Sequence, residues 1–113
     1  MKYALLIYEH AEDWDAYRND PDYAAAWPAF TQTLIDAGVM TGGAGLQGPD
    51  TATTVRIGDG DHTVQDGPFA EIREMLGGFY LIDVPSLDEA LKWAARVPVR
   101  AGCCVEVRPQ LEM

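Results

Sequence analysis

The sequence predicts an α+β fold, organised as a single domain over residues 1–113, in which helices cover one face of a sheet. Two segments, residues 2–8 and 79–84, are apolar at successive positions, as expected for strands inside a sheet that is covered on both faces. Two other segments, residues 21–37 and 86–97, repeat apolar residues at three- and four-residue steps, which indicates amphipathic helices.

The first helix has clear start and stop signals. Asp20 is a good N-cap and Pro21 is favoured at the first helical position, while Gly38 follows the last apolar residue. Pro28 lies inside the helix and predicts either a kink or two abutting helices. The preceding residues 11–20 are polar, and the spacing of two aromatic residues suggests one helical turn there. The expected buried stripe is Tyr23, Trp27, Phe30, Leu34 and Ala37.

The middle of the chain predicts strands and turns. Residues 39–46 contain three glycines and predict a strand that bends or bulges. Residues 51–57 and 62–65 alternate around a turn rich in Gly and Asp, residues 58–61, which predicts a hairpin.

The C-terminal part predicts a helix and a last strand. Ser86 and Glu89 have the spacing of a capping box at the helix start. Residues 103–108 alternate as in a strand exposed on one side. Without the hairpin, the element order is the βαββαβ arrangement called ferredoxin-like. The expected buried stripe of the helix is Leu87, Ala90, Leu91, Ala94 and Val97.

The composition limits the partners. Eight basic against eighteen acidic residues give a formal charge of −10, which repels phosphate backbones and argues against nucleic-acid binding. No segment is long and apolar enough for a membrane span, and the N-terminal apolar run is too short for a signal peptide. The adjacent Cys103 and Cys104 cannot close a loop, so we expect a reducing, cytoplasmic setting.

The two doubly apolar strands also predict a homodimer. The helices can cover only one face of the sheet, yet Leu6, Tyr8 and alternate residues of 79–84 leave the other face apolar. A bare apolar sheet face is rare on a soluble monomer, so we expect a second subunit laid against it.

The segment Asp66-Gly67-Pro68 predicts a tight turn that leads toward the central strand at 79–84. Asp can bond its own backbone, Gly permits positive φ, and Pro fixes φ. A polar, acid-containing loop beside a buried strand is where we expect a ligand. Asp66 is either a carboxylate that acts on a substrate or the cap of its own turn, and the sequence leaves both open.

Three stretches carry a family resemblance: Asp-Gly-Pro-Phe-Ala-Glu at 66–71, Leu-Gly-Gly-Phe-Tyr-Leu-Ile-Asp at 76–83, and Val-Glu-Val-Arg-Pro at 105–109. The chain resembles the YCII-related (YciI-like) proteins, in the subgroup named for its DGPF motif, over nearly its whole length. The resemblance implies a dimeric α/β barrel of ferredoxin-like units. It also implies a cleft discussed as the site of a histidine–aspartate pair, and leaves open whether His10 or His62 takes the histidine's role.

These observations predict a small-molecule-binding protein. If it is an enzyme, the expected reaction is proton abstraction of a lyase or isomerase type, with Asp66 as the general base and His10 or Glu71 assisting. The turn residues and three aromatic side chains would form the binding pocket: Tyr8, Gly67, Pro68, Phe69 and Tyr80.

A non-catalytic binding or regulatory module is the competing class. The resemblance links such modules to sigma-factor-type transcription regulation. His10 and His62 lack the spacing of a metal site, and the adjacent cysteines form no zinc or redox pattern, so we expect no metal and no cofactor.

Overall fold

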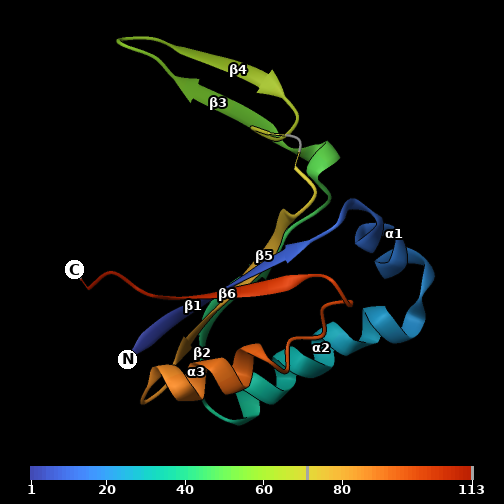
Figure 1. Cartoon of the computed structure of the whole chain (residues 1–113), viewed down its shortest axis with the longest axis vertical. Coiled ribbons are helices and arrows are strands. Elements are labelled where there is room, and N and C mark those ends of the chain that lie inside the picture. Colours follow the sequence, from blue (N-terminus) through green and yellow to red (C-terminus); the bar gives the residue numbers. More distant parts are fainter. Residues whose placement is uncertain (71, 113) are drawn as a thin grey trace.

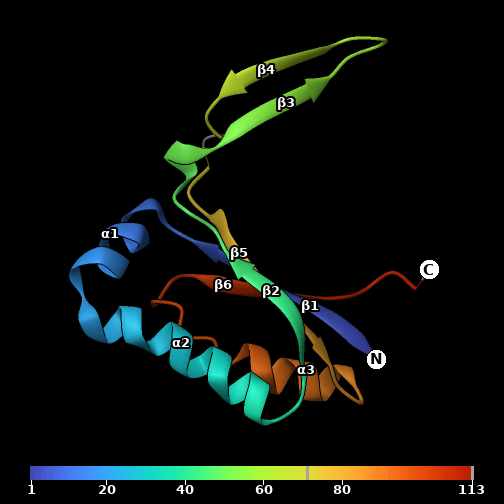
Figure 2. The same ribbon diagram turned by 180° about the vertical axis from the view of Figure 1, so that it is seen from behind.

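The computed structural model describes residues 1–70 and 72–112 and shows an α+β fold in two layers (Figures 1 and 2). One layer is a four-stranded antiparallel sheet in the order β2-β5-β1-β6. The first and third core strands, β1 and β5, are central, as the sequence predicts, and the arrangement is compatible with a ferredoxin-like fold. The strands are β1 (Lys2–Glu9), β2 (Met40–Gly45), β5 (Met75–Asp83) and β6 (Cys104–Pro109).

The second layer consists of helices α1 (Ala11–Asn19), α2 (Pro21–Asp36) and α3 (Leu87–Ala94), which lie on one side of the sheet (Figures 1 and 2). Residues 11–19 form a full helix rather than the single turn expected. No helix within the described residues has the length and apolar character needed to cross a membrane.

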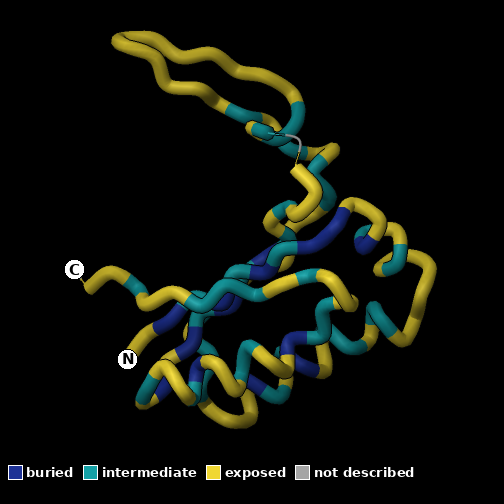
Figure 3. The backbone as a smooth tube through the Cα atoms, viewed as in Figure 1, coloured by how far each residue is buried: buried dark blue, intermediate teal, exposed yellow. Residues whose placement is uncertain are grey.

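The core lies between the two layers, where alternate residues of the central strands meet the helices (Figure 3). Leu5 and Ile82 are fully buried on the helix-facing side of the sheet, and Leu34 of α2 packs among them. Phe30 of α2 meets Tyr80 edge to face, with ring centroids 5.4 Å apart. This packing fixes α2 against β1 and β5 and sets the position of every side chain that α2 presents beyond the core.

Helix α2 begins where the sequence predicts. The Asp20 carboxylate accepts hydrogen bonds from the backbone amides of Asp22 and Tyr23. The helix continues through Pro28 without a break, so the alternative of two abutting helices is wrong. Pro28 lies on the exposed side of the helix, where solvent can satisfy the carbonyl that loses its amide partner. Ala37, expected in the buried stripe, is exposed just after the helix.

The buried face of α3 agrees in part with the predicted stripe, because Ala90 and Val97 are in the core. Ser86 caps the helix as expected, because its hydroxyl accepts a bond from the amide of Glu89. Leu87 and Leu91, however, are each 48% exposed. The helix instead turns Trp93 toward α2, where its ring lies 6.5 Å from that of Phe30. The large indole fills the space between the helices, and the two leucines are rotated outward.

The predicted hairpin is present and projects away from both layers (Figures 1 and 3). Strands β3 (Thr53–Ile57) and β4 (His62–Asp66) pair only with each other in a separate two-stranded sheet, which follows a short 3-10 turn, η1 (Pro49–Thr51). We call residues 53–66 the hairpin arm. Three of its apolar side chains are exposed: Val55, Ile57 and Val64. An isolated hairpin is marginally stable in water, so a second packing surface would stabilise it.

The other face of the sheet is partly open. Leu6 and Tyr8 of β1 and Phe79 and Leu81 of β5 are half-buried there, and no described helix covers them. An uncovered apolar sheet face is the feature from which a homodimer was predicted, and the dimer itself stays a prediction.

Candidate functional site

A cleft of about 830 Å³ opens between the sheet and helices α1 and α2. Its floor comes from the end of β1, where Glu9 follows the buried Ile7. The glycines of β2 and β5 form one side, and aromatic residues of α1 and α2 form the other. The cleft therefore lies at the end of the core, where apolar packing gives way to polar side chains.

Glu9 is the central polar group of this cleft. It continues the helix-facing alternation of β1 and is only 8% exposed. The Tyr23 hydroxyl donates a 2.9 Å hydrogen bond to its Oε1 atom. Its Oε2 atom occupies the space beside Gly77, where a Cβ would collide with it. A side chain at position 77 is thus incompatible with the present position of the carboxyl group.

The surroundings of Glu9 raise the pKa of its carboxyl group. Burial raises the pKa of the Glu9 carboxyl, the hydrogen bond from Tyr23 partly opposes this, and the negative charge of Asp13 adds to the rise. The pKa of the Tyr23 hydroxyl is also raised, first by burial and then by its bond to Glu9, so Tyr23 remains a hydrogen-bond donor. A carboxyl group whose pKa is moved toward neutrality is suited to both accept and return a proton.

Aromatic rings form the walls of the cleft. Trp14 and Tyr17 come from α1, Tyr23 and Trp27 from α2, and Tyr80 from β5. Several of their polar tips are already bonded within the protein: the Trp14 indole nitrogen donates to the Leu46 carbonyl at 3.1 Å, and the Tyr80 hydroxyl lies 2.7 Å from that of Thr31. The rings therefore offer mainly their apolar surfaces to a ligand.

Two glycines fix the strand edge of the cleft. Gly43 in β2 has φ 149°, and a Cβ there would lie 2.6 Å from the carbonyl oxygen of Phe79. Gly78 in β5 has φ 159°, and a Cβ there would lie 2.7 Å from the carbonyl oxygen of Ala44. Both positions accept only glycine in this geometry, which lets β2 and β5 approach closely beside Glu9.

A second polar cluster surrounds Asp13, which also lines the cleft. Asp13 is 3% exposed and accepts three bonds: from the His10 backbone amide at 2.8 Å, from the Cys103 thiol at 3.1 Å and from the Arg100 guanidinium at 3.3 Å. Burial, followed by the bond to Asp13, raises the pKa of the Cys103 thiol to about 11. The cluster ties α1 to the segment before β6.

The same cluster contains potential metal ligands. Side-chain donor atoms of His10, Asp13 and Cys103 lie within 4.8 Å of one another. The Asp13 carboxylate is already paired with the positive Arg100, however, and its oxygens accept the bonds that hold α1 in place. These bonds give the cluster a structural role, which is to anchor the start of α1.

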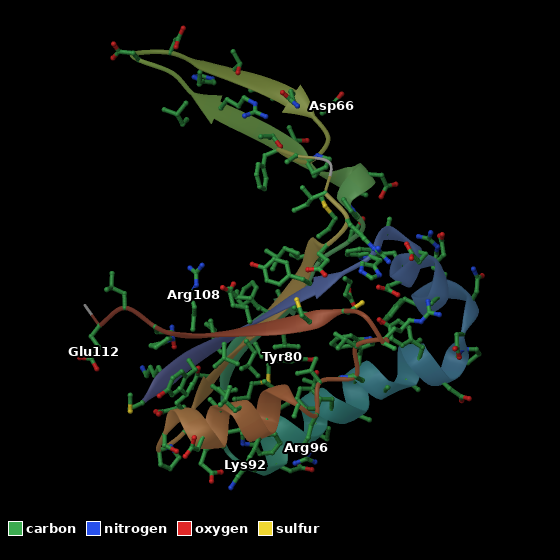
Figure 4. All side chains as sticks on the ribbon, viewed as in Figure 1. Asp66, Tyr80, Lys92, Arg96, Arg108 and Glu112 are labelled. Atoms are coloured by element: carbon green, nitrogen blue, oxygen red, sulfur yellow. The ribbon has the colours of Figure 1, made fainter. Side chains whose placement is uncertain are left out.

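The segment from Asp66 to Phe69, where the sequence predicted a ligand, lies outside the cleft. Figure 4 shows Asp66 on the hairpin arm and Tyr80 in the body of the molecule. Asp66 ends β4 and is exposed, and Phe69 is 67% exposed. Gly67 adopts φ 97°, as the turn prediction requires, and it and Pro68 are half-buried at the base of the arm. None of these four residues lines the cleft, so a role for Asp66 stays a prediction.

The other predicted site residues are separated as well. Tyr80 lines the cleft, whereas Tyr8 lies on the opposite face of the sheet and donates a 3.2 Å bond to Glu106. His10 is buried next to Glu9 and does not line the cleft. His62 is exposed in the hairpin arm. Glu71 lies outside the described residues.

Glu9 was not predicted as a site residue, and Tyr23 and Trp27 were expected in the core. The sequence did contain one indication of this site. Side chains alternate between the two faces of a strand, so Glu9 was expected on the same helix-facing side of β1 as Leu5 and Ile7. A buried acid at the end of an apolar strand is a stronger site indicator than an acid in a turn.

The fold and the cleft define a class of small α+β proteins in which a sheet and its helices enclose an acidic, aromatic-lined cleft. The model of the YCII-related domain matches residues 1–113, and the chain belongs to that family. It is 40% identical over 96 residues to the uncharacterised protein R00369 of Rhizobium meliloti (strain 1021), an alignment that covers 83% of this chain and 77% of the relative. The membership of the YCII-related family that the sequence predicted is thus confirmed, and the assignment to the DGPF subgroup stays a prediction.

Proposed function

We propose that this YCII-related chain binds a small organic molecule in the cleft beside Glu9 and that Glu9 exchanges a proton with it. The observation that carries the proposal is the Glu9 carboxyl group itself, which is buried, held at one oxygen by Tyr23 and placed in a cleft lined by aromatic rings. A fold gains little stability from a buried carboxyl group that lacks a basic partner, so a functional reason for it is favoured.

The geometry supports a division of roles between the two carboxyl oxygens. Oε1 accepts the bond from Tyr23, which orients the group. Oε2 packs against Gly77 and accepts no hydrogen bond from the residues that the structure describes, so it is the oxygen that would meet a ligand. Abstraction of a proton by Oε2 and its return at another atom is an isomerase-type step, and loss of a leaving group instead is a lyase-type step.

The test is a deuterium-exchange screen. A library of ring-containing small molecules is first screened for compounds that raise the Tm of the protein, because a ligand of the folded state stabilises it by mass action. The hits are then incubated with protein in D2O and followed by NMR. We expect protein-dependent exchange of a C–H proton in at least one hit, and loss of that exchange in Glu9→Gln with binding retained.

Binding without exchange would instead support the second candidate, a non-catalytic ligand-binding module. The family resemblance suggests a regulatory role beside sigma factors for such a module. Finding no hit whose stabilisation depends on a cleft residue would contradict both candidates.

We further propose that the chain forms a homodimer through the open sheet face. The half-buried Leu6 and Leu81 on that face and the exposed Val55 and Ile57 of the hairpin arm support it, since all would gain burial against a second copy. In such a dimer the arm could carry Asp66 to the partner, which is the setting in which the DGPF segment would meet a ligand. The free thiols of the adjacent cysteines support a cytoplasmic location.

A further inference from the structure

The cleft is lined by more acidic than basic side chains. Glu9, Asp13 and Asp50 are its acidic lining residues, and Arg18 is its basic one. Arg18 is already paired with Asp15, and Asp13 with Arg100. Within the described residues, neither Glu9 nor Asp50 forms a salt bridge, so the cleft holds acidic groups that lack a counter-charge. The chain as a whole adds to this potential with its formal charge of −10.

The aromatic walls of the cleft also favour a positively charged ligand. The face of an aromatic ring carries partial negative charge and attracts a cation within about 6 Å of its centre. Tyr23 and Trp27 are set edge to face, with centroids 6.2 Å apart and an interplanar angle of 85°. Such a right-angled pair presents two differently oriented surfaces to one space. Trp14 and Tyr17 approach the cleft from α1.

The hydrogen-bonding groups nearest Glu9 favour a donor as the ligand. The Tyr23 hydroxyl is committed to Oε1, and the Trp14 indole nitrogen to the Leu46 carbonyl. The oxygen of Glu9 left for a ligand is Oε2, an acceptor when the carboxyl group is ionised. An N–H⁺ group would supply both the donor and the missing counter-charge, whereas a carboxylate or phosphate would meet repulsion.

From these three features we infer that the ligand of the cleft is an organic cation, an amine or a protonated nitrogen heterocycle attached to an apolar or ring-containing body. The ammonium group lies against Glu9 Oε2, and the apolar body lies among the rings of Trp14, Tyr23 and Trp27. The inference rests on the proposed ligand-binding function and adds the charge of the ligand to it.

The test compares three probes of one shape and different charge: benzylammonium, benzyl alcohol and benzoate. Binding is followed by tryptophan fluorescence in a Trp93→Phe background, because Trp93 lies outside the cleft and packs against Phe30. We expect benzylammonium to bind at least about tenfold more tightly than benzyl alcohol, as one desolvated charge-assisted contact allows, and benzoate to bind most weakly. Added salt should weaken only the benzylammonium binding.

Two variants, each with one negative charge fewer than wild type, test whether Glu9 causes the preference for the cationic probe. Glu9→Gln should abolish the preference for benzylammonium over benzyl alcohol. Glu112→Gln removes the same charge from the exposed C-terminal segment (Figure 4) and should keep the preference. If Glu112→Gln weakens benzylammonium binding as much as Glu9→Gln does, overall charge rather than the cleft selects cations, and the inference is overturned.

The outcomes also separate this inference from the proposed function. Equal or tighter binding of benzyl alcohol or benzoate overturns the cation preference but leaves a small-molecule cleft in place. The inference also falls if library hits bind the cleft while benzylammonium does not. If no compound binds in a way that depends on Glu9 or the cleft rings, the proposed function falls together with it.

Discussion

Replacement of Gly77 by alanine tests whether the Glu9 carboxyl group occupies the position described. A Cβ at position 77 would collide with Oε2 of Glu9 and lie 3.0 Å from its Cδ atom, so the side chain must rotate away from Tyr23. Loss of a hydrogen bond to an ionised group costs about 1.5–3 kcal/mol. Replacing Gly by Ala in a compatible conformation returns about 0.4–1 kcal/mol. The net expectation at a pH where Glu9 is ionised is a loss of roughly 0.5–2.5 kcal/mol of unfolding free energy.

Gly45→Ala is the matched control. Gly45 also lines the cleft and lies in β2, but a Cβ there meets nothing within 4 Å. Gly45→Ala should therefore be neutral or stabilising by about 0.4–1 kcal/mol. The assay is urea unfolding of wild type and both variants, with Gly77→Ala repeated in a Glu9→Ala background. In that background the penalty at position 77 should disappear, which gives a coupling energy of about 1.5–3 kcal/mol in the double-mutant cycle. If Gly77→Ala behaves like Gly45→Ala, the position of Glu9 is wrong.

Three further predictions concern pH, the hairpin arm and assembly. Burial keeps the pKa of Glu9 above its ordinary value, so wild type should lose stability relative to Glu9→Gln as pH rises through that folded-state pKa, by about 1.4 kcal/mol for each unit of pKa difference. The difference in Tm between Glu9→Gln and wild type should therefore grow from pH 4 to pH 8, and a constant difference would contradict the burial of an ionisable group. Asp66→Asn should keep its Tm within a few degrees of wild type, since an exposed amide replaces an exposed carboxylate. If Asp66 also acts on a ligand in the dimer, this variant loses ligand binding. Full ligand binding by the variant would show that Asp66 is not part of the site. Light scattering at micromolar concentration should give about twice the chain mass of 12.4 kDa, and a monomer would refute the proposed role of the open sheet face.

Much of the fold could be predicted because its signals are local. The two segments that are apolar on both faces predicted the two central strands. Asp20-Pro21 predicted the start of α2, and the Gly/Asp-rich turn predicted the hairpin. On α3 the burial of Ala90 was predicted correctly, whereas that of Leu87 and Leu91 was not, because Leu and Trp side chains compete for the same interface and only tertiary packing decides which is buried.

The candidate site was harder to predict because it depends on contacts between distant segments. Glu9 meets Tyr23 across 14 positions, and Asp13 meets Cys103 across 90. Local turn chemistry drew attention to Asp66, which has the sequence features of a rigid loop but lies on the projecting arm. Loop chemistry alone gives no information on whether a turn faces a cleft.

NMR mapping of the binding site can show directly whether ligands bind beside Glu9. Benzylammonium would be titrated into uniformly labelled protein while backbone amide and indole signals are followed. The expectation for this site is that the largest shifts occur at Glu9, Gly77 and the indole groups of Trp14 and Trp27, with little change at Trp93. Shifts confined to Asp66–Phe69, or absent from the cleft, would contradict it.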